Sequence, residues 1–230
     1  MIQGKLGVWS LINSYEVLRV LLGSEIDFVV FDLEHGNWRR DQLAIANQMC
    51  RGAQKYSVLR IPSATQETMQ LAQDSLSDFV QISGIRSQTD IDKISMLTAY
   101  PPLGTLGYSP WTSYGIKYTN NVGFYPKISL QFEELAVLRS LIEGNLKLPQ
   151  QTNSIFIGRY DLSVSMGFPG DISNPILIQI IKSAQARVVG EKIKVGTVSN
   201  SITDALLMEE LGLHFISLGS DISRLTTMLT

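Results

Sequence analysis

The sequence predicts an α/β protein folded as one closed (β/α)8 barrel, a TIM barrel. Short apolar runs alternate with amphipathic segments, and eight such strand–helix pairs can be counted along the 230 residues. No change in composition marks a linker, so residues 1–230 are expected to form a single domain. Right-handed βα repetition over this length favours a closed barrel over an open doubly wound sheet, and no GxGxxG fingerprint follows the first strand.

Each predicted strand is a short apolar run that stops at polar, proline or glycine residues. The clearest is Phe28–Phe31, an unbroken aromatic and β-branched run of the kind found in parallel strands that are buried on both faces. On the same evidence we predict strands at Lys5–Leu11, Phe28–Phe31, Val58–Ile61, Asp78–Ile85, Ile128–Glu133, Ser154–Gly158, Lys194–Val198 and Phe215–Gly219.

The segments between the strands carry apolar residues at helical spacing. The first of them, Tyr15–Leu22, is amphipathic and is closed by Gly23. A long connection rich in proline, glycine and aromatic residues follows Tyr100 and runs to about Pro126, and connections of that length are usually functional. Helices are predicted at Tyr15–Leu22, Arg39–Gly52, Thr65–Ser75, Asp90–Leu97, Leu135–Glu143, Asn174–Gly190, Ile202–Leu211 and Ile222–Leu229.

The overall charge and composition exclude several classes of protein. With 19 basic and 21 acidic residues and a pI near 5.7, the chain shows no sign of a nucleic-acid or anionic-membrane partner. The N-terminus lacks a basic region followed by an apolar block, so we expect a soluble, cytoplasmic protein. The single cysteine, Cys50, excludes an internal disulfide, and its place on a predicted helix indicates a buried thiol rather than a nucleophile.

Polar groups gather directly after the strand Phe28–Phe31. Asp32, Glu34 and His35 follow this run, and His35 is one of two histidines in the chain. The carboxyl ends of parallel strands are where α/β barrels bind their ligands. A strand that merely ends in a polar turn is the alternative, but two acids and a histidine together favour a site.

Further titratable groups follow other predicted strands. Glu133 and Asp161 come from neighbouring strands, which lie about 4.8 Å apart in a sheet. Two carboxylates at that spacing can reach one divalent cation, and Mg²⁺ or Mn²⁺ accepts such a site while keeping positions for water and substrate. The alternative is that both acids cap helices, Asp161 in particular. The set at the strand ends is completed by Arg60, Gln131, Arg159 and Tyr160.

These motifs resemble the HpcH/HpaI aldolase family, the metal-dependent pyruvate aldolases. The similarity runs in order along nearly the whole chain and is carried by DLEHG at 32–36, VLRIP at 58–62, YPPLG at 100–104, LQFE at 130–133 and FIGRYDLSVSMGFPG at 156–170. It implies a barrel of the phosphoenolpyruvate/pyruvate type and an aldolase that acts on 4-hydroxy-2-oxo acids through a metal-bound pyruvate enolate. It also implies a divalent cation (Mg²⁺ or Mn²⁺, with Co²⁺ also possible), pyruvate and an aldehyde as small-molecule partners, and a homo-oligomer.

Carried over by position, the resemblance assigns the metal to Glu133 and Asp161. His35 matches the catalytic base, and Asp32 matches its supporting acid. These roles agree with elementary chemistry, because an imidazole titrates near neutral pH and an adjacent carboxylate raises its basicity. A histidine at the mouth could therefore take a proton from the hydroxyl of an aldol.

The resemblance also implies the residues that bind the substrate. Arg60 matches the residue that binds pyruvate and stabilises the enolate oxygen, a task suited to a guanidinium. Gln131 matches a substrate contact, and the backbone at Tyr160–Asp161 matches the seat of the pyruvate carboxylate. Gly158 belongs to the same set, and Arg159 is expected to recognise an acidic or phosphorylated acceptor, with a locally paired surface arginine as the alternative.

Asp74 matches a family acid that increases the basicity of the catalytic histidine. It lies late on a predicted helix, at the opposite end of the barrel from its own site, so it would have to serve a neighbouring subunit. A solvated helix acid is the alternative. The chain departs from the family at Leu106, where an arginine is usual, and at Arg159 and Tyr160, where small apolar residues are usual.

Two other functions compete with the aldolase. A thioester lyase of the citrate lyase β-subunit type would want more basic residues for a CoA tail than this chain offers. A barrel kept as a binding or assembly protein, with catalysis lost, would gain nothing from the converging charged groups described above.

Overall fold

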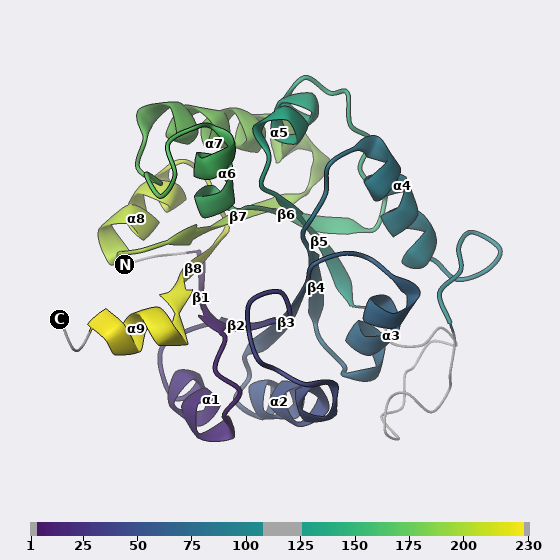
Figure 1. Ribbon diagram of the computed structural model, residues 1–230, viewed down its shortest axis with the longest axis vertical. Coiled ribbons are helices and arrows are strands. Elements are labelled where there is room, and N and C mark those ends of the chain that lie inside the picture. Colours follow the sequence, from purple (N-terminus) through teal and green to yellow (C-terminus); the bar gives the residue numbers. More distant parts are fainter. Residues whose placement is uncertain (1–3, 108–125, 228–230) are drawn as a thin grey trace.

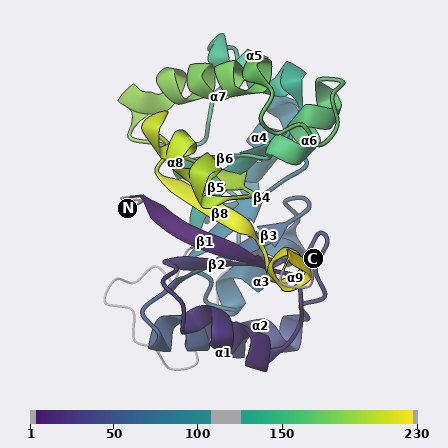
Figure 2. The same cartoon turned by 90° about the vertical axis from the view of Figure 1, so that its left-hand side faces the viewer.

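The computed structural model describes residues 4–107 and 126–227, which form a closed barrel of eight parallel strands surrounded by helices (Figures 1 and 2). Each strand pairs with the next, and β8 pairs with β1, so the predicted (β/α)8 fold is confirmed. The strands are β1 (Lys5–Ser10), β2 (Phe28–Asp32), β3 (Tyr56–Ile61), β4 (Phe79–Ile82), β5 (Lys127–Phe132), β6 (Thr152–Ile157), β7 (Lys194–Ser199) and β8 (Phe215–Ser220).

The helices lie outside the strands, and several of them begin at a residue whose side chain caps the first turn. Ser14 Oγ accepts a hydrogen bond from the Val17 amide at the start of α1, and Thr65 and Thr68 form a capping box at the start of α3. The helices are α1 (Tyr15–Leu22), α2 (Arg40–Gly52), α3 (Gln66–Asp74), α4 (Gln88–Leu97), α5 (Leu135–Ile142), α6 (Arg159–Ser165), α7 (Pro175–Val188), α8 (Ile202–Glu210) and α9 (Asp221–Thr227), with a short 3₁₀ helix at Val189–Glu191.

Most elements lie within two residues of their predicted bounds, and two of the described elements differ by more. Helix α6 was not expected, because its seven residues follow β6 directly and are too few to show a helical apolar repeat. Strand β4 is shorter than Asp78–Ile85: the Asp78 carboxylate accepts hydrogen bonds from the amide and hydroxyl of Ser57, and Gly84 adopts a positive φ of 67° that ends the strand. Most of the predicted loop, 108–125, and the end of the last predicted helix lie outside the described residues.

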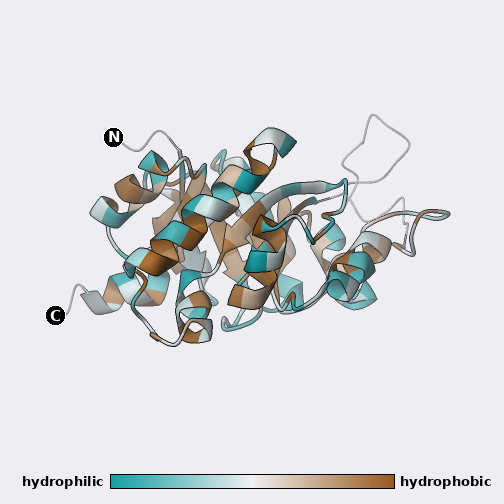
Figure 3. Cartoon of the chain, turned by 90° about the horizontal axis from the view of Figure 1, so that it is seen from above, coloured by the Kyte–Doolittle hydropathy of each residue, from teal (hydrophilic) through white to brown (hydrophobic). Residues whose placement is uncertain are grey.

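The side chains of each strand alternate between two hydrophobic cores. Those that point into the barrel form a small aromatic cluster of Trp9, Phe28, Val30, Val58, Phe156 and Val198. Those that point outward pack beneath the helices in a larger cluster, and Figure 3 shows the apolar strands at the centre of the molecule. Asp221, at the start of α9, accepts hydrogen bonds from the amides of Leu11 and Ile12, so the end of β8 is tied to the loop after β1.

Within residues 4–107 and 126–227, no helix combines the length and the apolar content that a bilayer crossing requires.

Candidate active site

Three polar side chains lie side by side on neighbouring strands near the carboxyl end of the barrel. Asp32 on β2 is in register with Arg60 on β3, and Arg60 is in register with Gln81 on β4. They occupy the same face as the inward residues Val30 and Val58, and all three are buried. The strand register alone therefore creates a polar layer inside the mouth of the barrel.

The Arg60 guanidinium is held in place from three directions. Its Nε and Nη2 atoms donate to Asp32 Oδ1 and Oδ2 at 2.8 and 2.6 Å, and its Nη1 lies 3.0 Å from Glu34 Oε2. The Trp9 ring lies under it, 4.5 Å from the guanidinium carbon, in a cation–π contact. Ser83 Oγ donates to the same Glu34 oxygen at 2.8 Å. These contacts fix the plane of the guanidinium and leave it N–H donors for a substrate oxygen.

Asp32 reaches His35 through the backbone and not through the ring. Its Oδ1 accepts hydrogen bonds from the amides of Glu34 and His35 at 2.9 and 3.3 Å, and both of its oxygens bind Arg60. Asp32 therefore shapes the loop and orients Arg60, and its role as the supporting acid of His35 stays a prediction. His35 follows the end of β2 and is exposed to solvent.

A second set of hydrogen bonds leads from β4 to the carboxylate after β5. Gln81 Nε2 donates to Gln131 Oε1, and Gln131 Nε2 donates to Glu133 Oε1. Gln81 and Gln131 are 1% and 2% exposed, so neither amide can exchange these partners for bulk water. Gln131 therefore holds Glu133 from the preceding inward position of β5, and its expected contact with substrate stays a prediction.

The mouth contains several acids that repel one another. Burial raises the pKa of Glu133, and the negative charges of Asp161 and Glu34 raise it further. The hydrogen bond from Gln131 and the positive charge of Arg60 act in the opposite direction. Glu133 and Asp161, the two predicted metal ligands, are therefore close enough for each to feel the charge of the other.

Gly158 and α6 bring Asp161 to the mouth. A Cβ atom at Gly158 would lie 2.8 Å from Glu133 Cγ and 3.2 Å from its Oε1, so glycine is needed for the carboxylate to occupy its place. Tyr160 and Asp161 lie in the first turn of α6 and are exposed. The first amides of a helix have no intrahelical acceptor, which suits the predicted seat of a carboxylate.

Arg159 does not reach the mouth, so the prediction that its side chain recognises an acceptor is wrong. The side chain is fully buried, and Nη1 and Nη2 donate to Asp204 Oδ2 and Oδ1 at 2.7 and 2.9 Å. It also donates to the carbonyl oxygens of Val198, at 3.0 Å, and Ile172. Arg159 points away from the barrel axis because helix α8, which carries Asp204, packs beside β7. It links α6 to β7, to α8 and to the loop that precedes α7.

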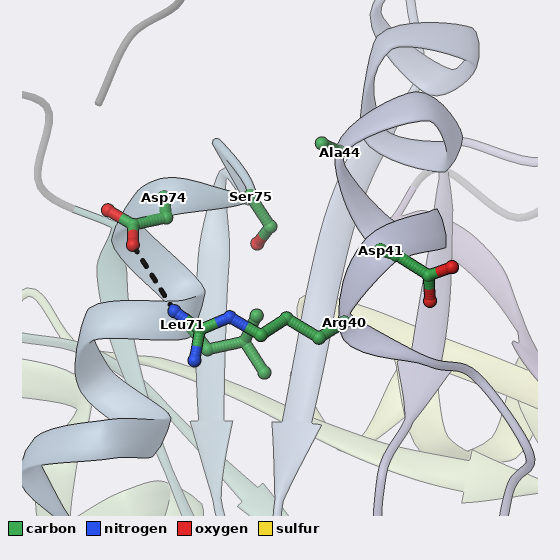
Figure 4. Close-up of a pocket in the computed structure, with 6 residues that line it drawn as sticks. All are labelled: Arg40, Asp41, Ala44, Leu71, Asp74 and Ser75. Atoms are coloured by element: carbon green, nitrogen blue, oxygen red, sulfur yellow. Dashed lines mark hydrogen bonds and ion pairs between the residues drawn. The ribbon is translucent and has the colours of Figure 1, made fainter. Parts of the chain in front are cut away.

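Asp74 is also separate from the mouth. It is the last residue of α3, at the end of the barrel where the strands begin, and it accepts hydrogen bonds from Gln70 Nε2 at 2.8 Å and Arg40 Nη2 at 3.5 Å. Figure 4 shows it at the rim of a hollow between α2 and α3, together with Arg40, Asp41, Ala44, Leu71 and Ser75. In this chain's own barrel, Asp74 contacts none of the mouth residues described above, and its role toward a neighbouring subunit stays a prediction.

Sequence analysis missed Gln81, Trp9 and Ser83 as parts of the site. Gln81 had a recognisable signal: it is a polar residue at an inward position of an otherwise apolar strand, where burial of an amide needs a partner. Trp9 and Ser83 had none, since their roles depend on the side chains of other strands. Leu106, one of the departures noted in the sequence, is buried in the outer core.

The second histidine, His214, lies at the opposite end of the barrel. Its Nδ1 accepts a hydrogen bond from the Val195 amide at 3.2 Å, and burial lowers its pKa. A neutral ring acting as an acceptor suits a structural role.

Eight parallel strands with acids, an immobilised guanidinium and an exposed imidazole at their carboxyl ends define a (β/α)8 barrel with its site in the usual place for that fold. A sequence profile of the HpcH/HpaI aldolase/citrate lyase family matches residues 5–227. The chain belongs to this family, and the predicted resemblance is confirmed.

Individual relatives are distant. A 5-keto-4-deoxy-D-glucarate aldolase of Salmonella arizonae is 25% identical over 229 residues, which cover 96% of this chain and 87% of the relative. Among solved structures, an HpcH/HpaI aldolase/citrate lyase family protein from Burkholderia cenocepacia has a TM-score of 0.86 at 20% identity, covering 98% of this chain and 91% of the other. Macrophomate synthase has a TM-score of 0.81 at 20% identity, with 98% and 81% covered. These two structures share the fold.

Proposed function

We propose that this protein is a divalent-metal-dependent aldolase that forms or cleaves the carbon–carbon bond between pyruvate and an aldehyde, with a 4-hydroxy-2-oxo acid as the substrate for cleavage. Membership of the HpcH/HpaI family and the distant similarity to an aldolase support the class of reaction. The observation that carries the proposal is that Asp161 and Arg60 both lie close enough to Glu133 for their charges to act on its carboxylate.

The carboxylate pair fits a hard divalent cation. Burial and the nearby charge of Asp161 make an ionised Glu133 unfavourable, and a cation between the two acids would remove that cost. The described residues contain no cluster of three or more histidines, cysteines or acids that could ligate a metal together. A donor set of two carboxylates suits Mg²⁺ or Mn²⁺, which keep positions for water and a chelating substrate. When bound, the cation would polarise the keto oxygen of pyruvate.

The other groups at the mouth would bind the substrate and move its proton. Arg60, fixed by Asp32 and Glu34, would donate to the oxygen on which negative charge develops as the bond breaks. His35, which is exposed just after β2, would take the proton from the substrate hydroxyl, so that the electrons of the oxygen–hydrogen bond can form the aldehyde. Gln131 would orient the pyruvate end.

We also propose that the protein works as a homo-oligomer in the cytoplasm. Large apolar side chains are exposed on α6, α7 and α8, namely those of Val164, Ile176 and Ile202. Multi-angle light scattering of the purified chain would test the assembly.

The proposal is tested by measuring pyruvate release from a panel of 4-hydroxy-2-oxo acids, with Mg²⁺, Mn²⁺ or Co²⁺ and with EDTA. We expect metal-dependent release that is lost in Glu133→Gln and Asp161→Asn and kept in Glu67→Gln, which neutralises an exposed acid on α3. If no member of the panel releases pyruvate, the proposed reaction is wrong. A protein kept only for binding would also lack Mn²⁺-dependent thermal stabilisation by oxalate, an enolate mimic.

A further inference from the structure

We infer that Gln81 is a positioning residue, which fixes the orientation of the Gln131 amide and thereby holds Glu133 ready for its cation. The inference rests on the proposed function in one respect, namely that Glu133 is a metal ligand. Gln81 itself lies one strand away from that ligand, on β4, and reaches it only through Gln131 on β5.

The three side chains form a continuous line of hydrogen bonds across two strands. Gln81 pairs in register with Ser129, and Gln131 is the next inward residue along β5. The Gln81 amide nitrogen donates to the Gln131 carbonyl oxygen, and the Gln131 amide nitrogen donates to Glu133 Oε1.

The carboxylate dictates the direction of the whole line. An ionised Glu133 can only accept hydrogen bonds, so Gln131 must turn its NH₂ group toward it. The carbonyl oxygen of Gln131 then faces Gln81, which must in turn present its own NH₂ group. The orientation of both amides thus follows from one negative charge, and Gln81 supplies the donor that makes this orientation the favourable one.

Filling the barrel does not explain a glutamine at this position. In register, Gln81 lies between Arg60 and Ser129, but the inward residues one step back along the strands, Val58 and the partly buried Phe79, are apolar, and a leucine would pack on them without burying a polar group. Without the donor from Gln81, the buried oxygen of Gln131 would lack its partner. Its amide could then rotate and present that oxygen to Glu133, where it would repel the carboxylate.

The inference is tested with Gln81→Leu, measuring Mn²⁺ affinity from the electron paramagnetic resonance of free Mn²⁺. Loss of a residue that orients a metal ligand typically weakens metal affinity by 10- to 100-fold, so we expect the dissociation constant to rise roughly tenfold or more. In a Gln131→Leu background, the second change at Gln81 should have no further effect, because the line is already broken. If Gln81→Leu does not fold, Gln81→Met serves in its place.

The matched control is Gln73→Leu, which makes the same change at another buried glutamine. Gln73 is 1% exposed and donates from Nε2 to the Tyr100 hydroxyl at 2.6 Å. This variant should unfold at a lower temperature but bind Mn²⁺ as the unchanged protein does. Equal Mn²⁺ affinity in Gln81→Leu and the unchanged protein would overturn the inference. So would a change at Gln81 that weakens Mn²⁺ binding by the same factor in the Gln131→Leu background as in the unchanged protein.

The two proposals fail in different ways. An unchanged protein that binds Mn²⁺ but releases no pyruvate refutes the aldolase, while the role of Gln81 is still decided by the Mn²⁺ dissociation constants. An active aldolase whose Gln81→Leu variant keeps full Mn²⁺ affinity refutes only the role of Gln81.

Discussion

The buried ion pair between Arg159 and Asp204 gives an asymmetric prediction about stability. The Arg159 side chain is 0% exposed, whereas that of Asp204 is 15% exposed. Asp204→Asn leaves a buried guanidinium without its counter-charge, and breaking a buried pair in this way costs about 3–5 kcal/mol of the free energy of unfolding. Arg159→Met leaves an acid that can turn toward water, so the loss should be nearer the 1.5–3 kcal/mol of a hydrogen bond to a charged group.

Equilibrium unfolding in urea measures both losses. We expect Asp204→Asn to lower the free energy of unfolding more than Arg159→Met does, and a double variant, Arg159→Met with Asp204→Leu, to recover part of the difference because no unpaired charge remains. Equal losses in the two single variants, or a loss below about 1 kcal/mol in Asp204→Asn, would contradict the argument. The choice of aldehyde should be the same in Arg159→Met as in the unchanged protein, because the side chain faces α8 and not the mouth.

Three further outcomes are expected. Gly158→Ala places a Cβ atom 2.8 Å from Glu133 Cγ and should weaken Mn²⁺ binding roughly tenfold or more, measured by titration calorimetry. Burial raises the pKa of Glu133, so the folded state holds the carboxyl proton more tightly than the unfolded state does. With EDTA present and at a pH above this raised pKa, Glu133→Gln should melt at a higher temperature than the unchanged protein, because it avoids burying the charge. Below the ordinary pKa of glutamate, the two melting temperatures should be equal. Burial also raises the pKa of the Cys50 thiol to about 12, so a disulfide reagent at pH 8 should react only after urea is added, and fast labelling of the folded chain would show that the thiol is accessible.

Much of the barrel can be predicted from the sequence because each strand is a buried apolar run. The bounds of α1 are as predicted, since Ser14 caps its start and Gly23 follows its end. Helix α6 was not predicted because a helix of seven residues after β6 is too short to show an apolar repeat. The predicted strand β4 is too long at both ends. Asp78 is held by a hydrogen bond from Ser57, which is distant in the sequence, and Gly84 has a positive φ; the local sequence pattern shows neither feature.

For the site, the sequence predicts where residues lie in the barrel but not which side chains they contact. Placing Asp32, Arg60 and Glu133 at the mouth needs only the rule that parallel strands end at one face. Which side chain binds which is a different matter, because it depends on the elements packed alongside. The direction of Arg159 depends on an acid of α8, more than forty positions later in the chain, and local spacing carries no information about such a partner.

The mouth residues are attached to the barrel in two ways. Arg60 and Gln131 project from strands, and each lies beside a polar side chain of a neighbouring strand, Asp32 and Gln81 respectively. Tyr160 lies on a seven-residue helix and is 46% exposed. For the aldolase activity proposed above, directed evolution toward new aldehydes should therefore begin at Tyr160, where substitutions cost little stability, and should leave Gln81 and Gln131 unchanged. The residues that carry the proposed reaction and the residue that selects the aldehyde could then be varied independently in the same barrel.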